Sequence, residues 1–256
     1  MIPKIIHYCW FGRSPLPLEN QMCLDSWKKF CPGWEILLWN EDNTPMDIKW
    51  IHEAYKHQKY AFVADYVRFW VLFNFGGIYM DTDMLLIKPL DFLLDHTLFL
   101  GREDAYNASM GIIGAEKNND FCKTCLEYYN SISFNMASPP IITRFITPIL
   151  FQFGFIEEDK TQHLTNGLMV YNSEWFYPIH YTDQFELNEI DRFIKPNTVG
   201  VHLWNKSWTD ELQLLSSGEY KRGFRLAFKR IIRTPFLPFK YYKKIVKYMF
   251  SWMFGR

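Results

Sequence analysis

The stretch from Asp65 to Pro89 most constrains the fold of this 256-residue chain. Apolar residues recur at helical spacing before Gly76-Gly77, and a helix end favours residues that are free to adopt positive φ. A short apolar strand follows and leads into Asp81-Thr82-Asp83. The apolar residues Met84 to Ile87 then predict a second extended segment. The sequence therefore predicts a helix, a tight stop, a strand, two carboxylates and another strand.

The two carboxylates of this stretch are one residue apart. In an extended chain, residues i and i+2 point to the same side, about 6.5–7 Å apart. Two bare carboxylates on one side repel each other and need a cation or a hydrogen-bond network. Hard oxygen ligands suit Mg²⁺ or Mn²⁺, so we expect one aspartate to bind metal directly and the other to act through water or a sugar hydroxyl. The alternative is a polar turn that happens to contain two aspartates.

Asp65 and Arg68 are three residues apart on the predicted helix and therefore share a face. Most of their neighbours are apolar or aromatic, so we expect a partly buried pair. The alternative is an ordinary ion pair on a helix surface. A helix that presents both charges beside the Asp-Thr-Asp strand suits a metal–diphosphate ligand that carries sugar hydroxyls.

The run D-Y-V-R at 65–68, followed by G-G-I-Y-M-D-T-D-M at 76–84, resembles the sugar-binding segment of glycosyltransferase family 32 and its relatives, including the large clostridial glucosylating toxins. This spacing is much more specific than two aspartates alone. The resemblance implies an α/β fold of the GT-A type, with a Rossmann-like, mostly parallel central sheet flanked by helices. It also implies a nucleotide-sugar donor, a divalent metal and retention of the anomeric configuration.

The N-terminal residues Lys4 to Gly12 predict a first strand that ends in a glycine turn. Ligands gather at the carboxyl ends of strands in open α/β sheets, so Trp10 and Phe11 would lie at the mouth of the site. An aromatic face there can stack on a nucleobase. The resemblance implies that Trp10 contacts uracil, which favours a UDP-linked donor. The alternative is that both aromatics belong to the core, as we expect for His7.

A helix over Glu19 to Phe30 and a strand over Trp34 to Trp39 complete a βαβ unit, which builds a parallel sheet. A strand is also expected at Thr97 to Gly101. Asn107 to Ala115 combines small residues with a strand pattern, and small residues let a ligand approach the backbone. We therefore place part of the donor-sugar pocket there, including Asn107; a glycine-containing core strand is the alternative. Ser138 to Thr143 departs from the Gly-Pro…Thr pattern of the family, which leaves the acceptor side undefined.

The second informative segment is Val199 to Trp208, where a strand ends in His202. Histidine beside carboxylates suits Mn²⁺, and lysine is a point-charge phosphate binder. The segment resembles the C-terminal closing loop of metal-dependent GT-A enzymes. That resemblance implies that His202 completes the metal site and that Lys206, Ser207 and Trp208 grip the diphosphate. A core histidine is the alternative.

The chain has no formal net charge, but its C-terminal part is strongly basic. From Tyr220 onward there are 11 Lys and Arg and no Asp or Glu, among large apolar residues at helical spacing. This composition is typical of helices that lie on anionic lipid. A nucleic-acid-binding tail and a helix packed on the catalytic domain are the alternatives; the absence of Asn and Gln from this part disfavours nucleic acid. We predict a catalytic domain over 1–218 and a membrane-associating tail over 219–256.

Cysteine usage and hydropathy bear on the location of the protein. Five scattered cysteines, including Cys122 and Cys125, fit buried thiols in a reducing cytoplasm. We expect no signal peptide and no membrane span, because no apolar run reaches about 18 residues. These features predict a cytoplasmic enzyme, peripheral on the inner face of the plasma membrane, where it would meet a lipid-linked saccharide acceptor.

The predicted function is metal-dependent transfer of a hexose from a nucleoside diphosphate sugar to a lipid-linked glycan in surface polysaccharide synthesis. The hexose would be galactose, glucose, mannose or an N-acetylated form. The alternatives are a metal- or carbohydrate-binding module without turnover and an inactive membrane scaffold. The predicted catalytic residues are Asp81, Asp83, Arg68 and Lys206, the metal ligands are Asp83, His202 and Asp81, and the donor-binding residues are Trp10, Phe11, Asp65, Tyr79, Asn107, Ser207 and Trp208.

Overall fold

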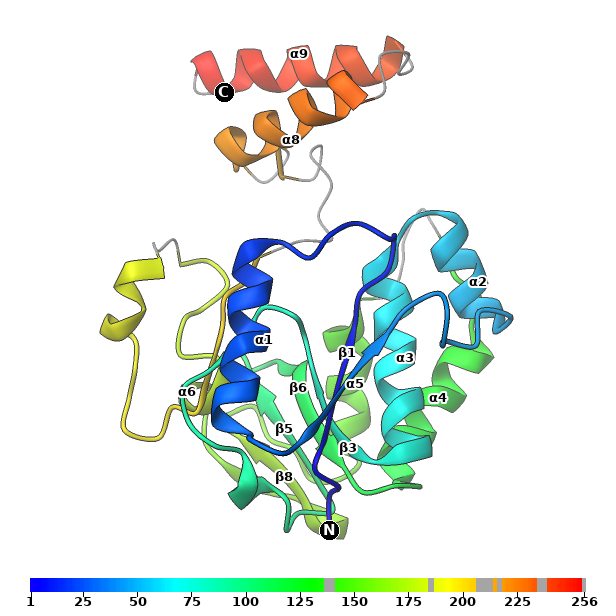
Figure 1. Ribbon diagram of the computed structural model, residues 1–256, viewed down its shortest axis with the longest axis vertical. Coiled ribbons are helices and arrows are strands. Elements are labelled where there is room, and N and C mark those ends of the chain that lie inside the picture. Colours follow the sequence, from blue (N-terminus) through cyan, green and yellow to red (C-terminus); the bar gives the residue numbers. More distant parts are fainter. Residues whose placement is uncertain (136–140, 184–186, 206–213, 216–217, 234–238, 255–256) are drawn as a thin grey trace. The chain divides into compact units, whose positions relative to one another are not determined.

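The computed structural model describes residues 1–135, 141–183, 187–205, 214–215, 218–233 and 239–254 (Figure 1). The chain divides into two compact units, residues 1–205 and 206–256. The first unit holds the central sheet, and the second holds the two C-terminal helices. The sequence placed this division slightly later, between residues 218 and 219.

The first unit is built on a seven-stranded sheet with the order β2-β1-β3-β6-β5-β8-β7. Five of these strands run in one direction, while β6 and β7 run in the other. The expected α/β fold with a mostly parallel sheet is therefore confirmed. A separate two-stranded antiparallel sheet pairs β4 (Met84–Leu86) with β9 (Gly200–His202). The strands of the main sheet are β1 (Ile5–Cys9), β2 (Glu35–Trp39), β3 (Gly77–Met80), β5 (Leu98–Arg102), β6 (Ala108–Ala115), β7 (Gln162–His163) and β8 (Leu168–Tyr171).

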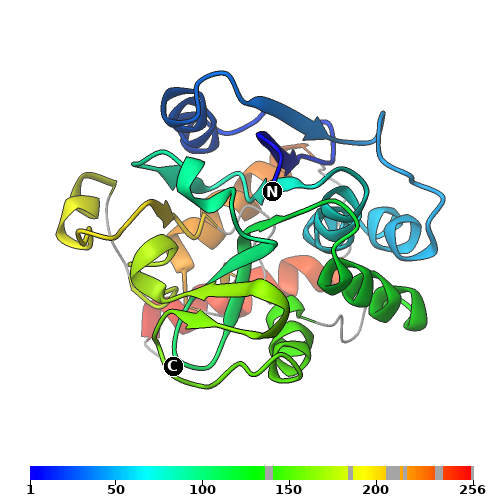
Figure 2. The same ribbon diagram turned by 90° about the horizontal axis from the view of Figure 1, so that it is seen from below.

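Helices cover both faces of the sheet. On one face α1 (Leu18–Phe30) packs with β4 and the short α6 (Ser173–Phe176) over one apolar cluster. The other face carries a second cluster beneath four helices. Seen from below, α1 (dark blue) lies across the strands from α3 and α4 (cyan and green) (Figure 2). These four helices are α2 (Lys49–Lys56), α3 (Tyr60–Phe75), α4 (Asp120–Ser131) and α5 (Ile142–Phe151), and 3-10 turns lie at Asp91–Leu93, Thr165–Gly167 and Leu187–Arg192.

The predicted corner between α3 and β3 is present. Gly76 ends α3 with a φ of +69° and donates its N–H to the carbonyl of Leu72 at 2.9 Å. Gly77 has a φ of +107°, and a Cβ there would lie 2.7 Å from the Ile5 carbonyl oxygen of β1. Only glycine allows this conformation and this close approach of β3 to β1. The glycine pair therefore sets the direction from which β3 enters the site.

The helices α2 and α5 were not predicted. In α2 the buried residues Trp50, Ile51 and Ala54 lie on one face of only eight residues. The apolar run of α5 contains Pro148 and has buried residues on several sides. Short apolar runs do not distinguish a helix from a buried strand, because both place apolar side chains against the core. The packing of these two segments against the sheet therefore determines that they form helices.

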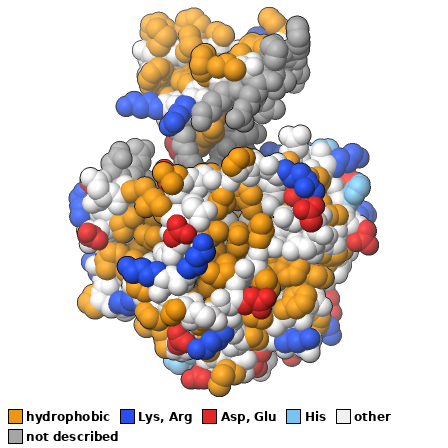
Figure 3. Space-filling model, viewed as in Figure 1, with side chains coloured by type: hydrophobic (Ala, Val, Ile, Leu, Met, Phe, Trp, Pro, Cys, Tyr) orange, Lys and Arg blue, Asp and Glu red, His pale blue; other side chains and the backbone are white. Residues whose placement is uncertain are grey.

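The described part of the second unit holds α8 (Tyr220–Arg233) and α9 (Phe239–Phe254), which agrees with the helical spacing of apolar residues from Tyr220 onward. The ring of Phe224 lies 5.6 Å from that of Trp252, so the two helices pack through aromatic side chains. Other large apolar side chains stay exposed, and hydrophobic atoms cover much of the described surface of these helices (Figure 3). Among the residues with described positions, no helix combines the length and the hydropathy needed to span a bilayer.

Candidate active site

The site begins with a turn at the end of β3. The backbone N–H of Met84 donates to the Asp81 carbonyl at 2.9 Å, so the chain turns back at Asp81-Thr82-Asp83. The expectation of an extended chain, with carboxylates about 6.5–7 Å apart, was wrong here. The turn forms because β4 leaves the main sheet to pair with β9. One carboxylate oxygen from each of Asp81 and Asp83 and one ring nitrogen of His202 all lie within 4.8 Å of one another.

His202 comes to these carboxylates on β9, where it is the register partner of Met84. Its Nε2 lies 3.3 Å from Oδ1 of Asp83 and 3.9 Å from Oδ2 of Asp81. The other carboxylate oxygen of Asp83 accepts the backbone N–H of Asn205 at 2.9 Å. Residues from two distant segments therefore meet at one point, as the sequence predicts for Asp81, Asp83 and His202.

These three side chains fit a divalent cation. Two carboxylates and one imidazole form a mixed oxygen and nitrogen donor set that suits Mn²⁺. Neighbouring ligands in an octahedral shell lie about 3 Å apart, so the observed separations need only a small contraction. Nδ1 of His202 is buried and has no hydrogen-bond partner within the described ranges. Since no described residue forms a hydrogen bond to Nδ1 that would fix the His202 ring, packing orients the ring so that Nε2 faces the two carboxylates.

Arg68 holds Asp81 from the α3 side of the sheet. Its guanidinium lies 3.1 Å from Asp65 and 3.3 Å from Asp81, and it also donates to the carbonyl of Met110. The guanidinium carbon lies 4.7 Å above the ring of Tyr79, whose hydroxyl donates to Asp81 at 3.2 Å. The predicted pair of Asp65 and Arg68 is therefore buried beside Asp81, and the surface-pair alternative is wrong.

Charges and burial set the proton affinities of this group. Burial alone would raise the pKa of Asp81, but Arg68, His202 and Tyr79 hold it below its ordinary value. Burial raises the pKa of Asp65 to about 7, against the effect of Arg68. Burial would lower the pKa of His202, but the carboxylates of Asp83 and Asp81 outweigh it and raise this pKa above 6.5. Asp81 is therefore ionised and ready to face a cation.

Small and aromatic residues shape the space around His202. A Cβ at Gly111 would lie 3.0 Å from the His202 ring and 3.0 Å from the Tyr177 hydroxyl oxygen. The ring of Trp204 lies 4.2 Å from that of His202, and its backbone adopts a φ of +53°. The groups that lie against Gly111 are His202 and Tyr177. The predicted approach of a donor sugar to the small residues of this strand stays a prediction.

Helix α1 supports the turn from the opposite side. The buried side chain of Asn20 donates to the hydroxyl of Thr82 at 2.8 Å, and the indole of Trp27 donates to the Met84 carbonyl at 2.6 Å. The sequence gives no signal for this contact, because a polar residue near the start of a helix is ordinary. Sequence reasoning did not identify Asn20, Trp27, Gly111, Tyr177, Trp204 or Asn205 as site residues.

The remaining predicted donor-binding residues lie outside this cluster of contacts. Trp10 is half-buried after β1, and its indole donates to the carbonyl of Ser14 at 2.7 Å. Phe11 is 5% exposed and belongs to the core cluster, which favours the packing alternative. Asn107 donates its amide to the carboxylate of Asp104. The roles of Trp10, Phe11 and Asn107 toward a donor stay predictions.

Three predicted residues, Lys206, Ser207 and Trp208, lie outside the residues that the structure describes. Their predicted role at the diphosphate follows only from their position after His202 in the chain.

Two family models match the chain. The model for the glycosyltransferase sugar-binding region containing the DXD motif matches residues 17–100. The model for the alpha 1,4-glycosyltransferase conserved region matches residues 114–225. The first range contains Asp81 and Asp83, and the second contains His202. Each half of the site thus falls within a glycosyltransferase model.

Curated relatives are glycosyltransferases. Lactosylceramide 4-alpha-galactosyltransferase of Mus musculus is 28% identical over 178 residues, which is 64% of this chain and 47% of the relative. Inositol phosphoceramide mannosyltransferase 3 of Schizosaccharomyces pombe is 28% identical over 159 residues, 59% of this chain and 43% of the relative. Human alpha-1,4-N-acetylglucosaminyltransferase is 27% identical over 195 residues, 74% of this chain and 51% of the relative. The chain spans roughly half the length of these relatives.

Solved structures that match include the PaToxG glycosyltransferase, with a TM-score of 0.46 and 19% identity over 59% of this chain and 69% of that one. A galactosyltransferase solved with donor and acceptor sugar analogues has a TM-score of 0.38 and 12% identity, over 94% of this chain and 99% of that one. The family that the sequence resembles is confirmed by the two family models and the curated relatives. Residues 17–100 thus match a glycosyltransferase sugar-binding region with a DXD motif, and residues 114–225 match an alpha 1,4-glycosyltransferase region.

Proposed function

We propose that this chain transfers a hexose from a nucleoside diphosphate sugar, with UDP favoured, to a hydroxyl of a lipid-linked saccharide. The observation that carries the proposal is the convergence of Asp81, Asp83 and His202, with Arg68 beside them. The names of two relatives, which act on lactosylceramide and inositol phosphoceramide, support a glycolipid acceptor. The family name of the second matched region supports an alpha-1,4 linkage.

The residues of the site have distinct tasks in this reaction. Asp83 and His202 would hold Mn²⁺ or Mg²⁺, with Asp81 beside them. A divalent cation bound there supplies Lewis-acid stabilisation of the charge that develops on the diphosphate leaving group. Arg68 keeps Asp81 ionised and fixes its orientation from the side of α3. Tyr79 restrains the same carboxylate through its hydroxyl.

The transfer step exchanges one bond at the anomeric carbon. The bond from this carbon to the diphosphate oxygen breaks, and its electron pair stays on the diphosphate. The acceptor hydroxyl oxygen forms the new bond, and its proton passes to the departing diphosphate. The preorganised charges of the site act where the negative charge develops, which is where such groups accelerate a reaction most.

We further propose that α8 and α9 hold the enzyme on an anionic membrane surface at the cytoplasmic face. Exposed apolar side chains of α9 recur at helical spacing at Val246, Met249, Phe250 and Met253. Exposed lysines lie on the same helix at 243, 244 and 247, and no acidic residue follows Glu219. A large apolar face with flanking basic residues favours anionic lipid. This position would bring the site to a lipid-linked acceptor in surface polysaccharide synthesis.

The direct test measures nucleotide release from UDP-galactose, UDP-glucose, UDP-N-acetylglucosamine and GDP-mannose, with Mn²⁺ or with EDTA. We expect Mn²⁺-dependent nucleotide release from at least one donor. Asp83→Ala should lower the rate of release by more than about 100-fold, because mutating a residue that merely hydrogen-bonds to a metal ligand already costs 10–100-fold in metal affinity or activity. Asp25→Ala, at an exposed position of α1, is the control. Sugar nucleotide binding without release would support a binding module, and release unaffected by EDTA would contradict the metal.

A further inference from the structure

The turn after β5 carries a further carboxyl group, Glu103. The N–H of Glu103 donates to the carbonyl of Asn107 at 3.0 Å, so the ladder between β5 and β6 continues one pair beyond Arg102. Alternate residues of a strand face the same side. Gly101 faces Tyr177, since a Cβ there would lie 2.6 Å from that ring. Glu103 therefore shares the face of the sheet on which Tyr177 packs.

The same face holds the metal-binding histidine. Tyr177 lies 5.5 Å from His202, ring to ring, and its hydroxyl accepts the backbone N–H of Ile112. The carboxyl of Glu103 is close enough to His202 and Tyr177 to interact electrostatically with both. Burial raises the pKa of Glu103 to about 7, Asp104 adds to the rise, and His202 opposes it. Sequence reasoning did not single out Glu103.

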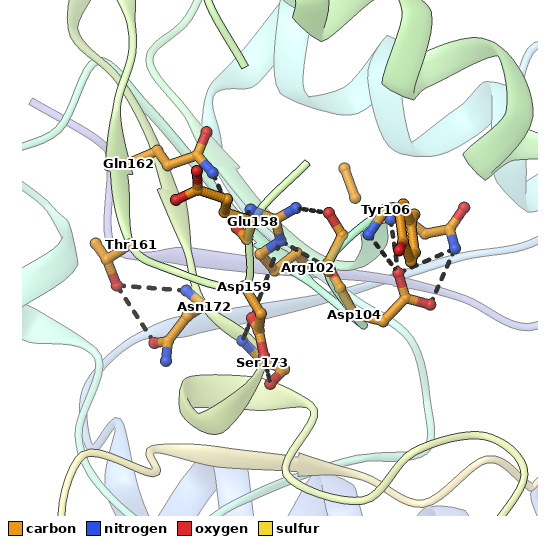
Figure 4. A network of polar contacts seen from close by, with 12 residues as sticks. Arg102, Asp104, Tyr106, Glu158, Asp159, Thr161, Gln162, Asn172 and Ser173 are labelled. Atoms are coloured by element: carbon orange, nitrogen blue, oxygen red, sulfur yellow. Dashed lines mark hydrogen bonds and ion pairs between the residues drawn. The ribbon is translucent and has the colours of Figure 1, made fainter. Parts of the chain in front are cut away.

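On the opposite face of the turn, the buried side chain of Arg102 holds the main chain by hydrogen bonds (Figure 4). Arg102 is fully buried, and its guanidinium donates to main-chain carbonyls on both sides of it. Within the turn these are Asp104, at 2.8 Å, and Ala105. Across from the turn they are Ile156 and Glu158. Arg102 thus ties the turn after β5 to the loop that precedes β7.

Further contacts hold both partners of Arg102 in place. The guanidinium carbon lies 4.5 Å above the ring of Phe155, in the core cluster beneath α3, α4 and α5. The amide of Gln162 donates to the carbonyls of Ile156 and Glu158, at 2.9 and 3.1 Å, and so shares them with the arginine (Figure 4). A side chain can be held in one position only if the main chain that carries it is restrained, and these contacts restrain the main chain next to Glu103.

Asp104 fastens the turn from its outer side. Its carboxylate accepts the N–H of Tyr106 at 2.7 Å, the N–H of Asn107 at 2.8 Å and the side-chain amide of Asn107 (Figure 4). Arg102 and Asp104 therefore restrain the five residues that carry Glu103 at one end and Asn107 at the other.

We propose that Glu103 binds a saccharide hydroxyl in the active site and that Arg102 and Asp104 are positioning residues that hold it there. A carboxyl group accepts hydrogen bonds from sugar hydroxyls, and the loss of a hydrogen bond to a charged group costs roughly 10- to 100-fold in affinity. The hydroxyl belongs to the donor sugar or to the acceptor. This inference rests on the proposed glycosyl transfer.

The experiment first measures binding of UDP with Mn²⁺ to the whole chain by calorimetry, and then kinetics. For the sugar nucleotide that the wild type uses, donor KM is measured from hydrolysis without acceptor, and acceptor KM with an alkyl lactoside. We expect Glu103→Gln to leave the Kd of UDP unchanged. A rise of about tenfold or more in donor KM assigns the donor hydroxyl, and the same rise in acceptor KM alone assigns the acceptor.

Two further variants test the positioning role. Asp104→Asn should raise the same KM as Glu103→Gln by a smaller factor, and the double variant should be no worse than Glu103→Gln alone, because both act through one contact. Glu127→Gln, exposed on α4, is the matched control. Unchanged KM values in Glu103→Gln, or additive losses in the double variant, overturn the inference. Failure of the wild type to bind UDP with Mn²⁺ overturns the proposed function instead.

Discussion

Nε2 of His202 lies 3.3 Å from Oδ1 of Asp83, although 119 positions separate these residues in the chain. The contact exists because β4 and β9 form their own antiparallel pair, in which Met84 opposes His202. The Leu203 N–H also donates to the Asp83 carbonyl at 2.9 Å, so the ladder extends to Asp83 itself. Backbone hydrogen bonds thereby set the separation of the two proposed metal ligands.

The pH dependence of metal binding follows from His202. In the metal-free protein its pKa lies above 6.5, because Asp83 and Asp81 outweigh the effect of burial. A metal takes the neutral imidazole, so we expect Mn²⁺ affinity to rise with pH until the pH exceeds this raised pKa, by up to about tenfold per unit. Calorimetry at pH 6, 7 and 8 measures it.

The stability of the metal-free protein should change in the opposite sense. A protonated His202 beside two carboxylates stabilises the folded chain below pH about 6.5, and this contribution is lost as the pH rises through the raised pKa. His202→Gln should remove most of the pH dependence of Mn²⁺ binding, whereas His57→Gln, at a half-exposed position after α2, should not. Equal wild-type affinity at pH 6 and pH 8 would contradict the role of His202.

Gly111→Ala should weaken metal binding through His202. The added methyl group would lie 3.0 Å from the His202 ring and from the Tyr177 hydroxyl oxygen, so the ring must move. Forcing an extra carbon into packed surroundings costs about 1–3 kcal/mol. We expect a lower midpoint of urea unfolding and a Kd for Mn²⁺ that is higher by about tenfold or more. Ala115→Gly on the same strand should lower the midpoint while leaving Mn²⁺ binding intact.

Arg68→Lys should destabilise the site although it keeps the charge. Arg68 reaches Asp65, Asp81 and the Met110 carbonyl at once, and an ammonium group lacks the planar fork that does this. A buried acceptor left without its partner costs about 1–3 kcal/mol. Urea unfolding measures the loss, with Arg192→Lys, in an exposed ion pair, as the control. Equal effects of the two substitutions would show that the buried network has no special weight.

The helices α8 and α9 should bind anionic vesicles. Replacing Lys243, Lys244 and Lys247 together with Gln should weaken binding to phosphatidylglycerol vesicles by at least about tenfold, since each lysine near an anionic surface contributes about 1 kcal/mol. Sedimentation with vesicles at two salt concentrations measures it. The same exchange at Lys28, Lys123 and Lys160 is the control, because these exposed lysines lie in the first unit. Equal binding to neutral and anionic vesicles would contradict the proposal.

Local patterns in the sequence predicted the elements around the carboxylates. The helix before Gly76, the strand after it and both C-terminal helices follow from periodicity and glycine placement. The turn at Asp81 to Asp83 was not predictable in this way, because it depends on β4 leaving the main sheet for β9. The short apolar runs of α2 and α5 could not be assigned, because their state depends on what packs against them.

The residues around the proposed metal ligands also divide into those that could be predicted from the sequence and those that could not. Asp65, Arg68 and His202 could be named because their charges stand out among apolar neighbours. Asn20, Glu103 and Tyr177 carry no such signal, since a polar or aromatic residue at the end of an element is ordinary in any chain. Their place at the site results from the pairing of distant strands.

By itself the sequence determined which residues could hold a cation and which segments form helices or strands, because these depend on side-chain chemistry and on neighbours a few positions away. The tertiary structure alone decided that Asp83 meets His202, that Gly111 makes room for that ring, and that the turn carrying Glu103 continues the pairing of β5 with β6. The physical reason is that strand pairing and packing act between residues far apart in the chain, and no local pattern records which of them will meet.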